Sequence, residues 1–275
     1  MSDYSYLSRN RILEELHGRS AGIRKKLGQN FLVDPNHIRL IAARTLDCGG
    51  ESLLEIGPGL GALTHIFLEN GRHVTAVEID AVLCDILQEK YGSNPLFTLI
   101  PGDALDLLKS DATLPPVVCG NLPYYISTDL LTAIVRRGSF RSGVFLVQSE
   151  FAERASGRSE SSSIHVFLSN FGEWKILHRV PRRSFFPAPD VESSLLGFTS
   201  FDAPLCDAVV LESLLRKSFL ARRKKILNSW KISSPEEAQR LAQKAQEFSL
   251  DTSLRAEEWR REDFYSLARS LANPE

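Results

Sequence analysis

The sequence has no long apolar run, and its first residues lack the apolar block that is typical of a signal peptide. None of its 275 residues belongs to an apolar run approaching the roughly 18 residues that a membrane-spanning helix needs. Its first 20 residues mix charged and apolar side chains, and Asp3, Glu14 and Glu15 argue against a transit peptide. We therefore expect a soluble, cytoplasmic protein that makes no contact with a membrane.

Cysteine is scarce and scattered. The four cysteines, Cys48, Cys84, Cys119 and Cys206, include no Cys-x-x-Cys pair, and none falls in a cluster with the six histidines. Zinc sites and disulfide frameworks both depend on such groupings. The sequence therefore predicts reduced structural thiols, no disulfide and no metal site.

An excess of positive charge is also missing, since 33 basic residues face 34 acidic ones and the net charge is −1. Bulk charge gives no support to a nucleic-acid partner, so only local patches could provide it. Basic residues gather at 24–26, 179–183 and 216–225. If the segment 216–225 is helical, four of its basic residues point away from the apolar side of the helix: Lys217, Arg222, Lys224 and Lys225. A charge run by itself more often marks a solvated face than a binding site.

Between residues 50 and 150, short apolar runs alternate with stretches of helical periodicity. The strand-like runs are 53–56, 73–77, 96–100, 117–119 and 144–148. The helical stretches are 61–70, 80–91 and 128–137. This β-α-β alternation is typical of the α/β class, in which helices cover both faces of a mostly parallel sheet.

The pattern changes near residue 203. Further strand-like runs lie at 164–171, 174–180 and 193–201. From Pro204 onward only helical patterns remain, at 207–220, 223–231, 235–247 and 262–272. We therefore predict three parts: an N-terminal extension with helical character at 1–24, an α/β domain at 25–203 and a small all-helical domain at 204–275.

A glycine-rich turn follows the first strand of the α/β region. Gly57, Gly59 and Gly61 separate the run 53–56 from a helix, and glycine there lets the backbone approach a ligand that a side chain would block. Pro58 removes one backbone N–H, which makes the turn a poor cradle for pyrophosphate and favours a ligand without phosphates. Such a turn alone is as often structural as functional.

Two carboxylates follow the next two strands. Glu78 comes directly after 73–77, where a carboxylate can accept hydrogen bonds from both hydroxyls of a ribose. Asp103 follows the third strand, where it could accept from an adenine amine. Either residue alone could instead cap a helix. Their order after Gly57 predicts a nucleoside-containing cofactor, without yet separating NAD from S-adenosylmethionine.

The fourth strand runs into the segment 120–125, Gly-Asn-Leu-Pro-Tyr-Tyr. Pro123 keeps Leu122 extended, so the Leu122 carbonyl and the Asn121 side-chain oxygen can both accept from one –NH2 group. Tyr124 then offers a ring face. Two acceptors would concentrate the lone pair of adenine N6 toward a sulfonium methyl, which suits methylation of that amine. An ordinary turn is the alternative, and its place beside the cofactor residues disfavours it.

Together these motifs resemble those of the ribosomal RNA adenine N6,N6-dimethyltransferases, over residues 24–272. The matching segments are KKLGQNFL at 25–32, EIGPGLGALT at 55–64, VEID at 77–80, GDAL at 102–105, GNLPYYIS at 120–127, FFPAPDVESS at 185–194, RRKKILNSW at 222–230 and RAEEWRREDFYSLA at 255–268. The resemblance implies a Rossmann-like S-adenosylmethionine-dependent methyltransferase fold at 25–203. It also implies that the helical domain at 204–275 binds RNA or the ribosomal subunit.

The resemblance further implies roles for single residues. The S-adenosylmethionine pocket would be lined by Asn30, Leu32, Gly57, Glu78, Asp103 and Asn121. The target adenine would be handled by Asn121, Leu122, Pro123 and Tyr124, with Phe185 packing on its other face. Phe185 could instead anchor a buried loop, as could Phe186. The segment 156–165 departs from the family pattern, so Arg158 is not assigned the role of the family's arginine there.

The resemblance favours the small-subunit branch, whose members dimethylate two adjacent adenosines in the 3′-terminal hairpin of small-subunit rRNA during subunit assembly. We expect a monomer that acts on the assembling subunit. Antibiotic-resistance methyltransferases of large-subunit rRNA are the main alternative, but they tend to be strongly basic. An NAD-dependent dehydrogenase would leave 120–125 unused, and DNA adenine methyltransferases more often carry proline in place of Leu122. A non-catalytic nucleic-acid-binding relative is a further alternative. It is disfavoured because all of the predicted adenine-binding residues from Asn121 to Tyr124 are present.

Overall fold

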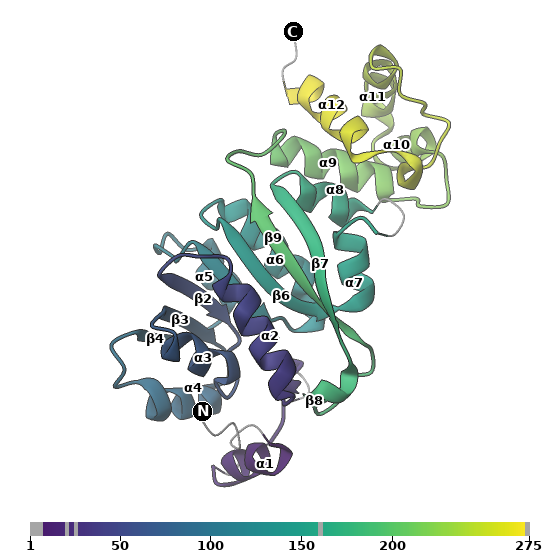
Figure 1. Ribbon diagram of the computed structural model, residues 1–275. Coiled ribbons are helices and arrows are strands. Elements are labelled where there is room, and N and C mark those ends of the chain that lie inside the picture. Colours follow the sequence, from purple (N-terminus) through teal and green to yellow (C-terminus); the bar gives the residue numbers. More distant parts are fainter. Residues whose placement is uncertain (1–7, 20–21, 25–26, 159–161, 273–275) are drawn as a thin grey trace. The chain divides into compact units, whose positions relative to one another are not determined.

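The computed structural model describes residues 8–19, 22–24, 27–158 and 162–272 (Figure 1). Lys25, Lys26 and residues 159–161 of the divergent segment lie outside the described residues. The chain divides into two compact units, Met1–Ala152 with Lys175–Thr199 and Glu153–Trp174 with Ser200–Glu275.

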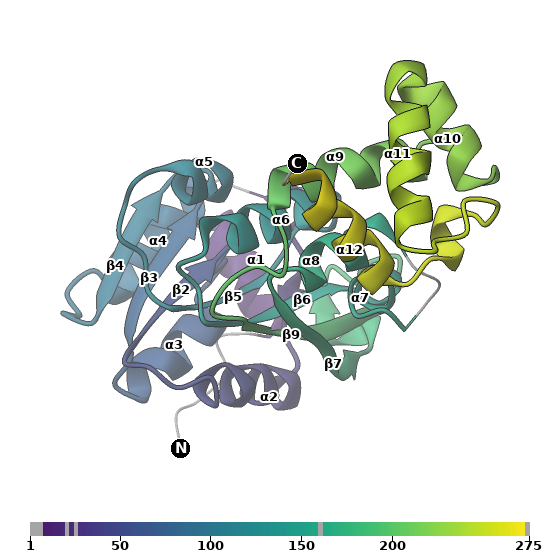
Figure 2. The ribbon, with the colours of Figure 1, turned by 90° about the horizontal axis from the view of Figure 1, so that it is seen from above.

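The central element of the fold is a seven-stranded sheet with the strand order β4-β3-β2-β5-β6-β9-β7. Its strands are β2 (Ser52–Ile56), β3 (His73–Glu78), β4 (Phe97–Pro101), β5 (Val117–Asn121), β6 (Ser142–Gln148), β7 (Gly172–Val180) and β9 (Ser193–Ser200). The strands from β4 to β6 are parallel, and β9 runs antiparallel to β6. Helices α2 (Pro35–Leu46) and α3 (Ala62–Glu69) cover one face, and α5 (Ala104–Lys109) and α6 (Ser127–Arg137) the other (Figure 2). The α/β prediction is confirmed.

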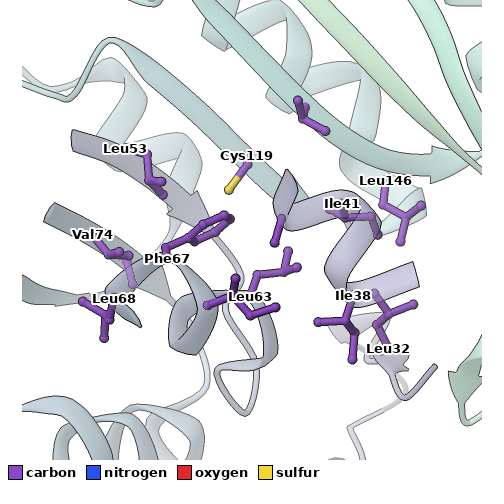
Figure 3. Packing of buried hydrophobic residues seen from close by; sticks show 14 of the residues in the cluster. Leu32, Ile38, Ile41, Leu53, Leu63, Phe67, Leu68, Val74, Cys119 and Leu146 are labelled. Carbon is purple, nitrogen blue, oxygen red and sulfur yellow. The ribbon is translucent and has the colours of Figure 1, made fainter. Parts of the chain in front are cut away.

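The core between this sheet and the helices α2 and α3 explains why these segments fold as they do. Leu53, Val74 and Cys119 come from three neighbouring strands and lie around Phe67 of α3, whereas Leu146 of β6 lies on the side of Ile41 of α2 (Figure 3). Burying side chains of this size stabilises the fold by roughly 1.5–3 kcal/mol each. Cys48, Cys84, Cys119 and Cys206 are free thiols in the structure.

A short antiparallel pair joins two segments that lie far apart in the sequence. Strand β1 (Phe31–Leu32) pairs with β8 (Phe185–Phe186), so that Leu32 lies opposite Phe185. Strand β1 follows α1 (Arg9–His17) in the chain. Strand β8 directly follows the 3-10 turn η4 (Arg182–Ser184). Helix α4 (Ala81–Tyr91) follows β3.

The prediction of a strand at 164–171 is wrong, because this segment forms α8 (Ser163–Ser169). The Ser162 side chain caps the helix by accepting from the His165 N–H at 3.2 Å. Its buried Val166, Phe167 and Leu168 pack within the second unit, where the Tyr265 hydroxyl donates to the Val166 carbonyl at 2.8 Å. Burial against helices therefore overrides the strand preference of this apolar run.

The second unit is helical, as predicted for the end of the chain, but it begins earlier. It takes in residues 153–174 because α8 packs on α9 and α12. Its remaining elements are α9 (Ala208–Phe219), α10 (Ile226–Ser233), α11 (Pro235–Glu247), η5 (Ala256–Glu258) and α12 (Arg261–Ala272). Trp230, Trp259 and Phe264 form its aromatic centre. The division of the sequence between Ala152 and Glu153 falls within α7 (Ser149–Ala155).

The basic segment 216–225 is not one helix. Helix α9 ends at Phe219 and α10 begins at Ile226, so Arg222, Lys224 and Lys225 lie in the intervening turn, where all three are exposed. Lys217 is not part of an open cationic surface, because its ammonium group pairs with the Glu237 carboxylate. The prediction that these residues share one face of a helix is therefore wrong. Arg222, Lys224 and Lys225 are nevertheless exposed, as residues of the turn.

Candidate active site

The carboxyl ends of four parallel strands place four of the predicted residues at one edge of the sheet. Gly57 follows β2, Glu78 ends β3, Asp103 follows β4 and Asn121 ends β5. Open α/β sheets bind ligands at this edge. Together with Asn30 and Leu32, these residues line one cavity of about 230 Å³. All six residues predicted to form a cofactor pocket are thus brought together.

The glycine turn and Glu78 form one hydrogen-bonded unit. Gly57 and Gly59 have φ values of +67° and +62°, a region that favours glycine. The Gly59 N–H donates to Glu78 Oε2 at 3.2 Å, and the Asp80 N–H donates to Glu78 Oε1 at 3.0 Å. Burial raises the pKa of Glu78 above its ordinary value, although both backbone donors favour the charged form. The carboxylate is therefore fixed between two loops on the wall of the cavity.

Asp103 caps a helix, which is one of the two roles that the sequence left open, and its place is compatible with the other. Its Oδ1 accepts from the Leu105 N–H at 2.8 Å and so caps α5. The same half-buried carboxylate lines the cavity. Capping fixes its orientation and leaves it able to meet a ligand.

The Asn121 side chain is oriented by the segment that precedes β1. Its Nδ2 donates to the carbonyl oxygen of Asn30 at 2.8 Å, and the Asn30 Nδ2 donates to the Gly28 carbonyl at 3.1 Å. Because the amide nitrogen of Asn121 is committed to this bond, its amide oxygen is the atom that it can offer to an amine donor. The sequence does not reveal this link between residues 30 and 121.

The other residues of the predicted adenine site lie in different surroundings. Leu122 is buried, and its N–H donates to the Leu146 carbonyl at 3.0 Å. Pro123 lines the cavity and leads into the 3-10 turn η3 (Tyr124–Ile126). The hydroxyl of Tyr124 lies 2.7 Å from the Ser193 hydroxyl, and burial raises the pKa of Tyr124.

Phe185 is 4% exposed and belongs to the core cluster that also contains Leu32. Phe186 is half-buried beneath the guanidinium of Arg9, which lies 4.9 Å from the ring centroid. Among the described residues, the lining of the cavity includes neither Tyr124 nor Phe185. Their packing on an adenine therefore stays a prediction.

The lining of the cavity also includes residues that sequence reasoning left without a role, among them Ile12, Glu55 and Tyr125. Glu55 is fully buried, accepts from the Thr64 hydroxyl at 2.6 Å, and has its pKa raised by burial to about 7. Tyr125, in contrast, is 63% exposed. The apolar spacing of Ile12 and Leu16 indicates a helix, but no local signal says what that helix covers.

The charged residues that line the cavity share one sign. Among its described lining residues they are Glu55, Glu78 and Asp103, and Lys and Arg are absent. In the part of the chain that the structure describes, no group of three or more histidine, cysteine or acidic residues could hold a metal ion. Within the same part, no helix is long and apolar enough to span a bilayer.

The family profile described as "Ribosomal RNA adenine dimethylase" matches residues 21–273. The small-subunit methyltransferase A of Lactococcus lactis is 34% identical over 95% of this chain and 94% of its own length. That of Treponema denticola is 38% identical over 77% of each chain.

Solved structures share the fold. The 23S rRNA methyltransferase ErmE aligns over 89% of this chain and all of its own, with a TM-score of 0.68 and 25% identity. A dimethyladenosine transferase from Plasmodium falciparum aligns over 85% of this chain and 94% of its own, with a TM-score of 0.71 and 23% identity. These likenesses confirm the methyltransferase fold predicted from the motifs. The profile match and the curated relatives place the chain in the ribosomal RNA adenine dimethylase family, in its small-subunit branch.

Proposed function

We propose that this protein is an S-adenosylmethionine-dependent enzyme that dimethylates adenine N6 in small-subunit rRNA. The observation that carries the proposal is that Asn121 ends its strand in the same cavity as Glu78 and Asp103. One cavity would therefore combine an acceptor for an amine with carboxylates that bind a nucleoside. Family membership supports the same reaction.

The residues of the cavity fit S-adenosylmethionine better than NAD. A pyrophosphate would meet three acidic side chains, and the described lining residues supply no lysine or arginine to balance it. A sulfonium and an ammonium group carry the opposite charge and suit this wall. Glu78 would accept from the ribose hydroxyls and Asp103 from the adenine amine. When bound, the cofactor supplies a methyl group that is open to direct displacement.

The protein's own contribution to the reaction is orientation and hydrogen bonding. The amide oxygen of Asn121 and the carbonyl of Leu122 would accept from the two hydrogens of the target N6. This favours a pyramidal nitrogen whose lone pair is directed at the methyl group. Because the bond to Asn30 sets the Asn121 amide before substrate arrives, little reorganisation remains. The Tyr124 and Phe185 rings would pack on the flipped base.

We further propose that the targets are two adjacent adenosines in the 3′-terminal hairpin, presented by an assembling small subunit in the cytoplasm. A protein with a net charge of −1 needs contacts beyond its local patches to hold RNA. The exposed basic turn at 222–225 belongs to one of these patches and would contact the RNA backbone, while the assembling subunit would supply the remaining contacts. We expect the protein to act as a monomer without a metal ion.

Purified small subunits that lack the modification should accept methyl groups, whereas large subunits and DNA should not. The measurement is mass spectrometry of nucleosides after incubation with the protein and S-adenosylmethionine. Dimethyladenosine confined to the small subunit is the expected product. Dimethyladenosine confined to large-subunit RNA would favour the alternative suggested by the similarity to ErmE.

The hydroxyl of Ser193 should position Tyr124 for catalysis. Ser193→Ala removes the 2.7 Å bond to the Tyr124 hydroxyl, and we expect kcat to fall about 2- to 10-fold while cofactor affinity is unchanged. Tyr124→Phe removes the same bond from its other side, so the double variant should lose no more than either single variant.

Ser194→Ala is the matched control for Ser193→Ala. Ser194 is equally buried, and its hydroxyl lies 2.8 Å from that of Ser149. Both alanine variants should lose similar stability in thermal unfolding, but only Ser193→Ala should lose turnover. Equal losses of turnover in the two would assign Ser193 to structure alone.

A further inference from the structure

Helix α1 (Arg9–His17) belongs to the extension for which the motifs suggest no role. The Ser8 hydroxyl caps it by accepting from the Arg11 N–H at 3.3 Å. Ile12 and Leu16 are four residues apart and therefore lie on one face of the helix. They are 0% and 3% exposed, so this face is buried.

The buried face of α1 packs on the elements that surround the cavity. Ile12 and Leu16 form one cluster with Phe31 of β1, Leu60 of the glycine turn and Leu83 of α4. Within this cluster the two α1 residues differ in one respect. Ile12 lines the cavity, whereas Leu16, one turn later, does not.

Polar contacts hold α1 and the residues after it in this place. The Arg19 guanidinium pairs with both carboxylate oxygens of Glu89, and Lys90 Nζ lies 3.1 Å from Glu15 Oε1. At the other end of the helix, Arg9 lies over the ring of Phe186. The helix is thus tied to α4 on one side and to β8 on the other.

The segment that follows α1 is tied to the loop beyond Glu78. Gln29 Nε2 donates to Asp80 Oδ2 at 2.8 Å, and Arg24 Nη1 lies 3.4 Å from Asp80 Oδ1. Asp80 in turn donates its N–H to Glu78. The extension therefore adjoins the carboxylate that is proposed to hold the ribose.

We propose that α1 forms one wall of the cofactor site and that Ile12 is a direct apolar contact of the bound nucleoside cofactor. The proposal rests on the proposed function in so far as it takes this cavity to be the cofactor site. Because Ile12 is already shielded from water, its contribution to binding would come from van der Waals contact with the ligand rather than from newly buried area. The extension would then increase cofactor affinity, in addition to stabilising the fold.

The test compares Ile12→Ala with Leu16→Ala in the full chain, using S-adenosylhomocysteine as the probe in calorimetry without RNA. Both variants shorten a buried side chain of the same helix and cluster, so both should lower the midpoint of thermal unfolding. Ile12→Ala should weaken binding of the probe about tenfold, because alanine lacks the side-chain atoms that would contact it. Leu16→Ala should change it by less than about twofold.

Equal weakening by the two variants would mean that α1 acts only through packing, and would overturn the proposal. Unchanged binding in Ile12→Ala would overturn it as well. If the alanine variants fail to fold, Ile12→Val and Leu16→Val provide the same comparison with a smaller difference, about two- to threefold. The proposed function fails separately: in that case the unsubstituted chain itself does not bind S-adenosylhomocysteine.

Discussion

Asn121→Ala should fold yet lose methyl transfer by about 100- to 1000-fold in kcat at saturating cofactor and RNA. The amide oxygen is proposed to accept from N6 as that nitrogen becomes nucleophilic, so its removal raises the barrier to the chemical step more than it weakens RNA binding. The measurement is single-turnover transfer of labelled methyl groups to unmethylated small subunits.

The structure adds a second consequence to this substitution. Asn121 also donates to the Asn30 carbonyl at 2.8 Å, so alanine removes a contact that holds the residues before β1. We expect a modest loss of cofactor affinity, of roughly 0.5–1.5 kcal/mol. Asn121→Asp keeps an acceptor oxygen but cannot donate to Asn30, so it should retain more turnover than alanine. Near-normal kcat in Asn121→Ala would rule out the proposed role.

Glu78→Ala should weaken S-adenosylmethionine binding by roughly 1–3 kcal/mol, or about 5- to 150-fold in Kd. The buried carboxylate is proposed to accept from the ribose hydroxyls, and it also accepts from the Gly59 and Asp80 N–H groups at 3.2 and 3.0 Å. Alanine therefore removes ligand contacts and loosens the glycine turn together. Glu78→Gln retains one acceptor oxygen, so its affinity for S-adenosylmethionine should lie between those of the unsubstituted protein and Glu78→Ala.

The measurement for Glu78 is titration calorimetry, with thermal unfolding to verify the fold. Glu51→Ala, which removes an exposed carboxylate just before β2, is the control and should bind normally. Burial raises the pKa of Glu78, so its charged form is lost at a higher pH than that of an exposed glutamate. Cofactor affinity should accordingly fall as the pH is lowered toward that raised pKa. Unchanged affinity in a folded Glu78→Ala variant would contradict the assignment.

Strand periodicity was sufficient to predict the sheet because each strand carries its apolar side chains in its own sequence. The runs at 53–56, 73–77 and 117–119 all lie within β2, β3 and β5. Residues placed directly after such strands, such as Glu78 and Asn121, share an edge of the sheet by topology alone. This is why Glu78 and Asn121 could be assigned to one site from the sequence.

Periodicity failed where the decisive contacts come from elsewhere in the chain. The run 164–171 has the composition of a strand, yet it forms α8, because α9 and α12 offer it a helical surface to pack on. Lys217 belongs to a basic run in the sequence, but Glu237, twenty residues later, neutralises it. Neither partner is visible to a local pattern.

The sequence by itself determined the family, the α/β architecture and the order of acidic and amide residues along the sheet edge, because each is written in local motifs and strand spacing. Only the tertiary structure decided how those residues are held. The Asn30 carbonyl orients Asn121, Ser193 holds the Tyr124 hydroxyl, and α1 brings Ile12 to the wall of the cavity. The physical reason is the same in each case, because the side chain is held by a contact with a distant part of the chain. The two hydrogen bonds join residues that are 69 or more positions apart in the sequence. Helix α1 is held by packing against β1, the glycine turn and α4.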